Sequence, residues 1–144
     1  MLEIEINKEN LEKFLLNIRN SDKEELIYFL GENYKEKFVK TVLENKKYTY
    51  FLSYNSIPSC IGGIYKDKYG AQVWLLCAEK YDKKYLFRYI KEKINIFKRD
   101  NSYLYNYIYR TNFNAIRMLS RLGFEVIDLK TPVIKKFYYE RRLP

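Results

Sequence analysis

Hydrophobic positions in the first third of the chain recur first with the period of a strand and then with that of helices. Leu2, Ile4 and Ile6 alternate with glutamates, which predicts a short half-buried strand. Three helices are predicted after it. The first follows an Asn7 cap, the second starts at Ser21 or Asp22 and stops at Gly31, and the third covers about residues 33–44.

From Tyr48 the pattern changes to that of strands. Tyr48 to Tyr54 and Ser59 to Tyr65 predict a hairpin with its turn at Asn55–Pro58. The pair Gly62-Gly63 inside the second strand predicts a bulge or a close approach of another backbone, and a bulge is favoured over a ligand contact. Val73 to Cys77 is a continuous apolar run, which is typical of a buried central strand.

The rest of the chain alternates between helix and strand. The pattern predicts a helix near 81–98, a strand at Tyr103–Arg110 with its tyrosines on one face, a helix at Asn114–Arg121, and strands at Phe124–Leu129 and Val133–Tyr139. The order is therefore strand, three helices, three strands, helix, strand, helix and two strands. We expect one α/β (α+β) domain over residues 1–144, with a mixed sheet and helices on both faces.

The absence of histidine from the 144 residues excludes several kinds of chemistry. There can be no Ser-His-Asp triad, no Cys-His pair, no imidazole base and no His-ligated zinc. Cys60 and Cys77 are too few for a structural zinc site, and we expect them to be buried free thiols. No metal site is predicted.

Charge is divided unevenly along the chain. Residues 1–45 hold ten acids and seven bases, a net charge of −3, and residues 46–144 hold eight acids and twenty bases, a net charge of +12. Such a basic half can attract nucleic acid, acidic protein or a polyphosphate such as coenzyme A, although it can also serve only solubility. No apolar run is long enough for a membrane span and no secretory signal is visible, so we expect a cytoplasmic protein.

Residues 112–124 read Asn-Phe-Asn-Ala-Ile-Arg-Met-Leu-Ser-Arg-Leu-Gly-Phe. This stretch resembles the late motif of the GNAT superfamily of N-acetyltransferases, in which Asn112, Ala115, Gly123 and Phe124 fall in place. The predicted order of elements over the whole chain also matches that superfamily. The resemblance implies a GNAT-like fold and a site for acetyl-CoA.

The chain departs from the superfamily pattern at two places. The turn before the long helix usually carries glycines whose N–H groups cradle the coenzyme pyrophosphate. Here residues 78–85 contain no glycine, and they include acidic Glu79 and Asp82. The second departure is Leu119, which stands where the superfamily often has the tyrosine that protonates the leaving thiolate.

A closer resemblance covers about residues 57–127. The motif Ile61-Gly62-Gly63, a strand containing Trp74, a basic helix without the glycine loop, and the Asn112 motif are together similar to the small GNAT-like proteins of T7-like podoviruses. Those proteins are associated with internal virion proteins and virion morphogenesis. This resemblance implies a phage-encoded, virion-associated protein with protein partners from the virion or the host.

Three hypotheses follow, and the first is favoured. A non-catalytic GNAT-fold protein would bind other proteins and need no cofactor. A basic module would bind nucleic acid without sequence specificity. An active acetyltransferase would let an amine attack the thioester directly. Its candidate coenzyme-binding residues are Leu76, Cys77, Lys83, Lys84, Arg88 and Asn112, its candidate acids Tyr105, Tyr107 and Tyr109, and its candidate bases Glu79 and Asp82.

Overall fold

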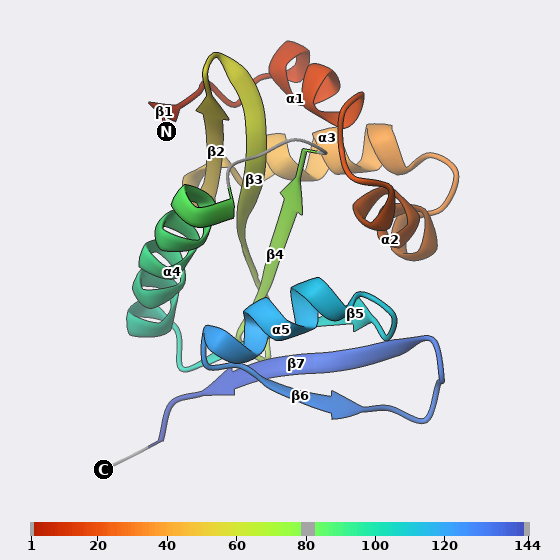
Figure 1. The fold of residues 1–144 in the computed structure, drawn as a ribbon, viewed down its shortest axis with the longest axis vertical. Coiled ribbons are helices and arrows are strands. Elements are labelled where there is room, and N and C mark those ends of the chain that lie inside the picture. Colours follow the sequence, from red (N-terminus) through yellow and green to blue (C-terminus); the bar gives the residue numbers. More distant parts are fainter. Residues whose placement is uncertain (1, 79–82, 143–144) are drawn as a thin grey trace. The chain divides into compact units, whose positions relative to one another are not determined.

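A computed structural model describes residues 2–78 and 83–142 of the protein (Figure 1). The chain forms two compact units: unit 1 comprises residues 1–63 and 74–86, and unit 2 comprises residues 64–73 and 87–144. Two strands, β3 (Ile57–Lys66) and β4 (Ala71–Cys77), contribute to both units. The element order agrees with the order expected from the hydrophobic pattern, with one short 3-10 turn added at Lys46–Tyr48.

Unit 1 contains strands in the order β1-β2-β3-β4. β1 (Leu2–Glu3) and β2 (Thr49–Tyr54) are antiparallel, as are β2 and β3. The first strand is shorter than the alternation through Ile6 predicts. The chain leaves it after the Ile4 N–H donates to the Phe51 carbonyl, and Asn7 then caps α1 by accepting a hydrogen bond of 2.8 Å from the Asn10 N–H.

Three helices of unit 1 build a hydrophobic core on one side of these strands. They are α1 (Lys8–Leu15), α2 (Asn20–Leu30) and α3 (Tyr34–Glu44). Their buried side chains include Leu11, Phe14 and Val42, and they meet Phe51 and Ile61, which are cross-strand partners. The ring of Phe38 contacts Trp74 edge to face, so Trp74 packs against this core.

The start of α2 differs from the prediction. Ser21 or Asp22 was expected to cap this helix, but it starts at Asn20, and Arg19 occupies the cap position without a side-chain cap bond. The reason is that the Asp22 side chain is used elsewhere, in a contact with the end of β4.

The hairpin between β2 and β3 turns on Asn55 and Ser56, both with positive φ. The predicted loop was therefore too long, and Pro58 lies inside β3. Of the two readings of Gly62-Gly63, a bulge is absent from the pairing of β2 with β3, whose register shifts between Leu52 and Ser53 instead. The alternative of close backbone approach is confirmed, because a Cβ on Gly62 would lie 2.8 Å from the Trp74 carbonyl oxygen.

Unit 2 contains strands in the order β3-β4-β5-β7-β6. β4 is parallel to β5 (Tyr103–Tyr109), and β7 (Ile134–Glu140) is antiparallel to β5 and to β6 (Glu125–Asp128). Parallel and antiparallel pairs occur together, which confirms the mixed sheet. The parallel pairing is short, because only Ala71 and Gln72 of β4 are in register with β5.

Two helices, α4 (Lys83–Asp100) and α5 (Phe113–Arg121), belong wholly or mainly to unit 2. They pack on the sheet face that carries Leu104 and Phe137, where the ring of Phe124 meets that of Phe137 edge to face. The tyrosines of β5 lie on the other face. The predicted separation of tyrosines from Leu104 and Ile108 on β5 is thus confirmed.

Candidate functional site

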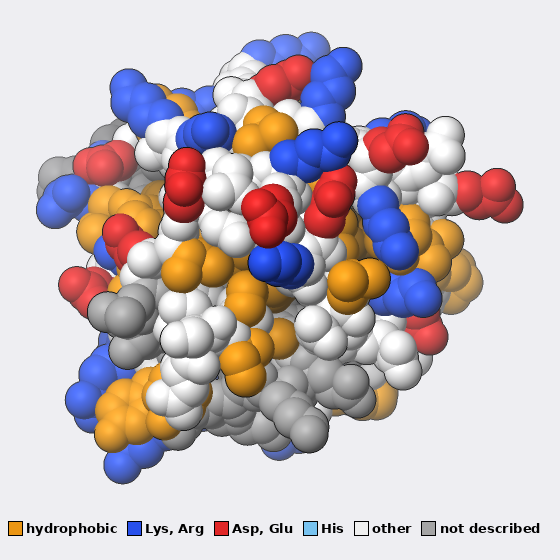
Figure 2. Space-filling model, turned by 90° about the horizontal axis from the view of Figure 1, so that it is seen from above, with side chains coloured by type: hydrophobic (Ala, Val, Ile, Leu, Met, Phe, Trp, Pro, Cys, Tyr) orange, Lys and Arg blue, Asp and Glu red, His pale blue; other side chains and the backbone are white. Residues whose placement is uncertain are grey.

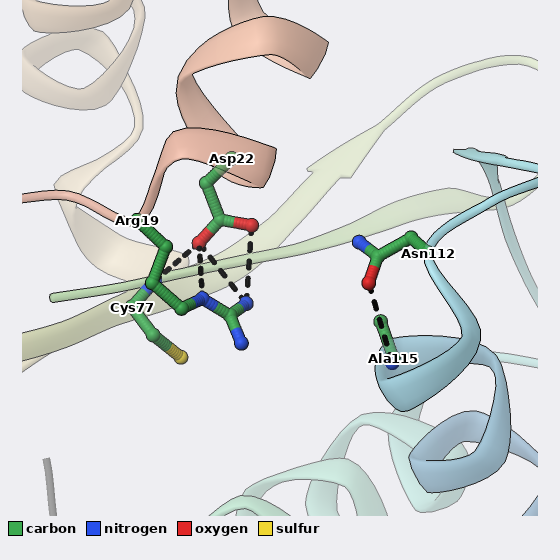
Figure 3. Close-up of polar contacts among 5 residues, drawn as sticks. All are labelled: Arg19, Asp22, Cys77, Asn112 and Ala115. Carbon is green, nitrogen blue, oxygen red and sulfur yellow. Dashed lines mark hydrogen bonds and ion pairs between the residues drawn. The ribbon is translucent and has the colours of Figure 1, made fainter. Parts of the chain in front are cut away.

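The end of β4 is the centre of the candidate site in unit 1. The Ala78 N–H donates to the Ser59 carbonyl of β3 over 2.8 Å. Backbone groups of successive strand residues point to opposite edges, so the N–H and C=O of Cys77 point away from β3. Both are engaged, since the N–H donates to Asp22 Oδ2 over 2.8 Å and the carbonyl accepts from the Arg19 N–H over 3.1 Å (Figure 3).

The Asp22 carboxylate accepts hydrogen bonds from the Arg19 side chain and from the Cys77 N–H. The Arg19 guanidinium contacts Oδ1 through Nη2 at 3.1 Å and Oδ2 through Nε at 3.2 Å. Asp22 is 2% exposed, and burial raises its pKa, while Arg19 and the Cys77 N–H act in the opposite direction. Together with the isolated antiparallel bridge between Ile18 and Ala78, this arrangement closes the edge of β4 with the segment between α1 and α2.

The two cysteines are buried and free, as the sequence predicts. Burial raises the pKa of the Cys77 thiol to about 12 and also raises the pKa of Cys60. A thiol that stays protonated at neutral pH is a poor nucleophile. The structure thus agrees with an inert role for Cys77, although its backbone lies at the centre of the candidate site.

The predicted coenzyme-binding residues lie in different environments. Leu76 is buried in the core of unit 1 next to Cys77. Lys84 and Arg88 are exposed on α4. Glu79 and Asp82, the candidate bases, and the side chain of Lys83 lie outside the described residues. Binding of coenzyme by these residues stays a prediction.

Asn112, which matches the late motif, and Leu119, which departs from it, both have structural roles at α5 in unit 2. The Asn112 side chain caps the helix by accepting from the Ala115 N–H over 3.4 Å (Figure 3). Leu119 is buried, and its carbonyl accepts from the Phe124 N–H where the helix ends. Gly123 follows with a φ of 90°, which is the left-handed C-terminal position that the motif predicts. Leucine supplies no proton at this position.

The hydroxyl of Tyr105, in the tyrosine row of β5, both donates and accepts a hydrogen bond. Tyr105 donates to Asp67 Oδ2 over 2.5 Å and accepts from Gln72 Nε2 over 3.1 Å. Asp67 also accepts from the N–H groups of Tyr69 and Gly70, so the bond ties the β3–β4 turn to β5. Hydrogen bonding to Asp67 raises the pKa of Tyr105, while the bond from Tyr105 lowers the pKa of Asp67.

The other two candidate acids differ from Tyr105. Tyr107 is half-buried, and its ring meets that of Tyr105 edge to face with centroids 6.3 Å apart. Tyr109 ends β5, pairs with Ile134, and is also half-buried. Tyr105 therefore has a structural role, and the use of Tyr107 or Tyr109 as an acid stays a prediction.

We expect Tyr105→Phe to lower the melting temperature by a few degrees, because the change removes the hydroxyl and keeps the ring stack on Tyr103. The bond makes its full contribution to stability between 3.8 and 10.0, the ordinary pKa values of aspartate and tyrosine, because folding lowers the pKa of Asp67 and raises that of Tyr105. Its contribution is lost as pH falls through the Asp67 pKa and as pH rises through the raised Tyr105 pKa.

Thermal melts across this pH range measure the effect, with Tyr69→Phe as the control because Tyr69 is 68% exposed. Equal melting temperatures for the wild type and Tyr105→Phe at pH 7 would contradict the structural role.

Comparison with solved structures identifies the architecture. The PaiA N-acetyltransferase from Thermoplasma acidophilum, solved with coenzyme A, superposes with a TM-score of 0.74 over 97% of this chain and 98% of that chain, at 18% identity. The ribosomal-protein-alanine N-acetyltransferase from Brucella melitensis gives 0.65 over 99% and 100%, at 10% identity. This chain has the GNAT fold.

A third GNAT-fold neighbour carries the coenzyme in its acetylated form. It is yncA from Salmonella typhimurium, a putative acetyltransferase solved with acetyl-CoA, with a TM-score of 0.59 at 13% identity over 74% of this chain and 73% of that one. No protein-family model matches the sequence, and no curated protein matches it. At such low sequence identities the superpositions show a shared fold only. Function has to be inferred from the residues of the site.

The described residues contain neither a metal-binding cluster nor a membrane-spanning helix. Among residues 2–78 and 83–142, no group of three or more cysteine or acidic side chains is arranged to hold a metal ion. Within the same residues, none of the helices is long and apolar enough to cross a membrane.

Two functional features were missed by the sequence reasoning, Asp22 with Arg19 and Asp67 with Tyr105. Asp22 looked like an ordinary helix cap, because an acid in the first turn of a helix is common. Its partner Cys77 is 55 residues away, and no spacing reveals such a contact. Asp67 could have been noticed as the first residue of a turn ending in Gly70, but not as a partner of Tyr105.

Proposed function

We propose that this chain is a GNAT-fold protein with a degenerate acetyl-CoA site that works by binding other proteins without catalysis. The observation that carries the proposal is the hydrogen bond from the Cys77 N–H to Asp22. In an active enzyme the backbone at Leu76 and Cys77 would hold the pantetheine arm. A backbone N–H carries a single hydrogen, so this group cannot serve the coenzyme while Asp22 holds it.

Displacing Asp22 would also be costly. Its carboxylate is buried, and a buried charge that loses a hydrogen-bond donor is destabilised. The described residues therefore do not fit the coenzyme as they stand, and we derive no chemical step through it. The glycine-free stretch 78–85 and Leu119 support the same conclusion from the sequence.

The resemblance to small proteins of T7-like podoviruses gives the proposal its biological setting. We propose that the chain is phage-encoded and acts in virion assembly, in the host cytoplasm or within the virion. Its tyrosine-rich surfaces favour protein partners, because tyrosine is enriched in protein interfaces. An immunoblot of purified particles of the phage that encodes it tests this part separately.

The experiment that tests the degenerate site is a thermal shift with acetyl-CoA, with coenzyme A in parallel. A ligand at a hundred times its dissociation constant adds roughly 2.7 kcal/mol, or a rise of about 5 to 10 °C. We expect no rise at millimolar ligand. The PaiA N-acetyltransferase from Thermoplasma acidophilum, which was solved with coenzyme A, serves as the positive control. A rise of the full size for this chain would contradict the proposal.

An active N-acetyltransferase is the second candidate, and the neighbours solved with acetyl-CoA or coenzyme A favour it. In that case Tyr105 is a poor acid, because its proton is already donated to Asp67. Acetyl transfer to amines, measured for Tyr107→Phe and Tyr109→Phe, separates the two functions. Nucleic-acid binding is the weakest candidate, because the sequence carries no signature of a known nucleic-acid-binding module. Figure 2 shows one face of the molecule, on which basic and acidic side chains are interspersed.

A further inference from the structure

The carboxylate of Asp22 belongs to the first turn of α2, yet it is directed to the end of β4. Its Oδ2 accepts from the Cys77 N–H over 2.8 Å, although the two residues are 55 positions apart in the sequence. The cap position of α2 makes no side-chain cap bond, so the helix start is left without one. Asp22 is only 2% exposed, and its contact with Cys77 is therefore made in the interior of unit 1.

The backbone that leads into α2 follows the same edge of β4. The Arg19 N–H donates to the Cys77 carbonyl over 3.1 Å, and Ile18 forms an antiparallel bridge with Ala78. We call residues 18–22 the β4 strap. Figure 3 shows its Arg19 and Asp22 side chains joined to each other, with the Asp22 carboxylate reaching Cys77. The strap thus covers both backbone groups of Cys77.

The strap leaves different capacity on the two backbone groups of Cys77. A carbonyl oxygen has two lone pairs, so the bond from the Arg19 N–H leaves room for a second donor. A backbone N–H has one hydrogen, and Asp22 takes it. Of these two strap contacts, the one made by Asp22 is therefore the one that shuts a ligand out of this strand end.

We propose that Asp22 is an autoinhibitory residue that excludes coenzyme A from β4, and that removal of its carboxylate restores binding. The pantetheine arm of coenzyme A contains amide carbonyls, which accept from the Cys77 N–H only when Asp22 has released it. The inference rests on the proposed function, because it takes the wild type as unable to bind the coenzyme. It adds that one removable contact, and not the glycine-free stretch 78–85, causes the loss.

Two variants at one position separate the hydrogen bond from the ion pair. Asp22→Ala removes every acceptor at this position, so the Cys77 N–H is released. Asp22→Asn loses the charge but keeps an oxygen that accepts from the same N–H, so it should stay closed. Thermal melts with millimolar coenzyme A are compared with each variant's own ligand-free melt. We expect a rise of about 3 to 6 °C for Asp22→Ala, the size given by ligand at about ten times its dissociation constant.

A second open variant keeps the test decisive if Asp22→Ala does not fold. Arg19→Met together with Asp22→Ala removes the guanidinium as well as the carboxylate, so no charge of the former pair is left without its partner. The Cys77 N–H is released in this variant too, and we expect the same rise with coenzyme A. Titration calorimetry of both open variants measures binding without reference to their melting temperatures.

The nucleotide part of coenzyme A, without the pantetheine arm, is the ligand control. It should give no rise, because the proposed contact is with the arm. A rise as large as that with the whole coenzyme would assign the binding to the phosphates and overturn the inference. An equal rise for Asp22→Asn and Asp22→Ala would also overturn it, since the acceptor at this position would then not matter.

The wild type separates failure of the inference from failure of the proposed function. No binding by the wild type and none by a folded open variant would overturn the inference and leave the degenerate site standing. Binding by the wild type itself would overturn both. Binding by the open variants, with none by the wild type or Asp22→Asn, is the result we expect.

Discussion

Replacing Asp22 with alanine should lower the free energy of unfolding by about 3 kcal/mol, or roughly 10 °C in melting temperature. The change removes the partner of the Arg19 guanidinium, whose side chain is 23% exposed, and leaves the Cys77 N–H without its acceptor. Loss of one partner from a buried pair is costly because the remaining charge keeps its desolvation penalty. Urea unfolding of the variant and the wild type measures the difference.

Asp22→Asn is the informative companion. The amide oxygen can still accept from the Cys77 N–H, while the ion pair with Arg19 is lost, so the cost should fall between wild type and Asp22→Ala. Glu24→Ala, at an exposed position on the same helix, controls for general effects on α2. A cost below about 1 kcal/mol for Asp22→Ala would show that the contact does not hold the end of β4 in solution.

The second large effect is expected for Gly63→Ala, at about 3 kcal/mol or more. A Cβ at this position would overlap the carbonyl oxygen of Tyr48 and would lie 3.0 Å from the Cα of Thr49. Both neighbours are backbone atoms, so no side-chain rotation can relieve the overlap, and the edge between β2 and β3 must move. The melting temperature and the far-ultraviolet dichroism of the variant measure this.

Gly31→Ala provides the matched control. Gly31 has a φ of 85° and an added Cβ would meet nothing within 4 Å, so that variant tests backbone strain without a clash. With ψ at −165° this backbone lies in a region essentially restricted to glycine, so the cost of the variant should be about 1 to 3 kcal/mol. A cost for Gly63→Ala below that of Gly31→Ala would mean that the close approach at Gly63 is relaxed in solution.

The order and types of the elements were predictable because hydrophobic periodicity is local. Leu11 and Phe14 repeat on one face of α1, and Asn7 lies where an N-cap is needed, so sequence neighbours alone define the helix. Boundaries were less accurate where a distant contact decides them. The start of α2 is one example, because the Asp22 side chain serves β4 instead of its own helix.

The candidate site was harder to predict for the same reason. The sequence points to Cys77 and Tyr105 as positions of interest, and the structure shows that both carry partners from far along the chain, Asp22 and Asp67. Chain separation hides such pairs, since a carboxylate at a helix start or in a turn is locally satisfied in most proteins. Conversely, Gly123 was predictable, because a left-handed helix end has a local signature.

The burial of both sulfur atoms has a practical consequence for fluorescence and spin-label work. Because Cys60 and Cys77 are buried and burial raises the pKa of each thiol, neither offers a reactive thiolate to a maleimide or a nitroxide reagent at neutral pH. A cysteine introduced at an exposed residue, such as Lys40, would be the preferred attachment point for a probe. Distances within the native molecule can thus be measured without first replacing its own cysteines.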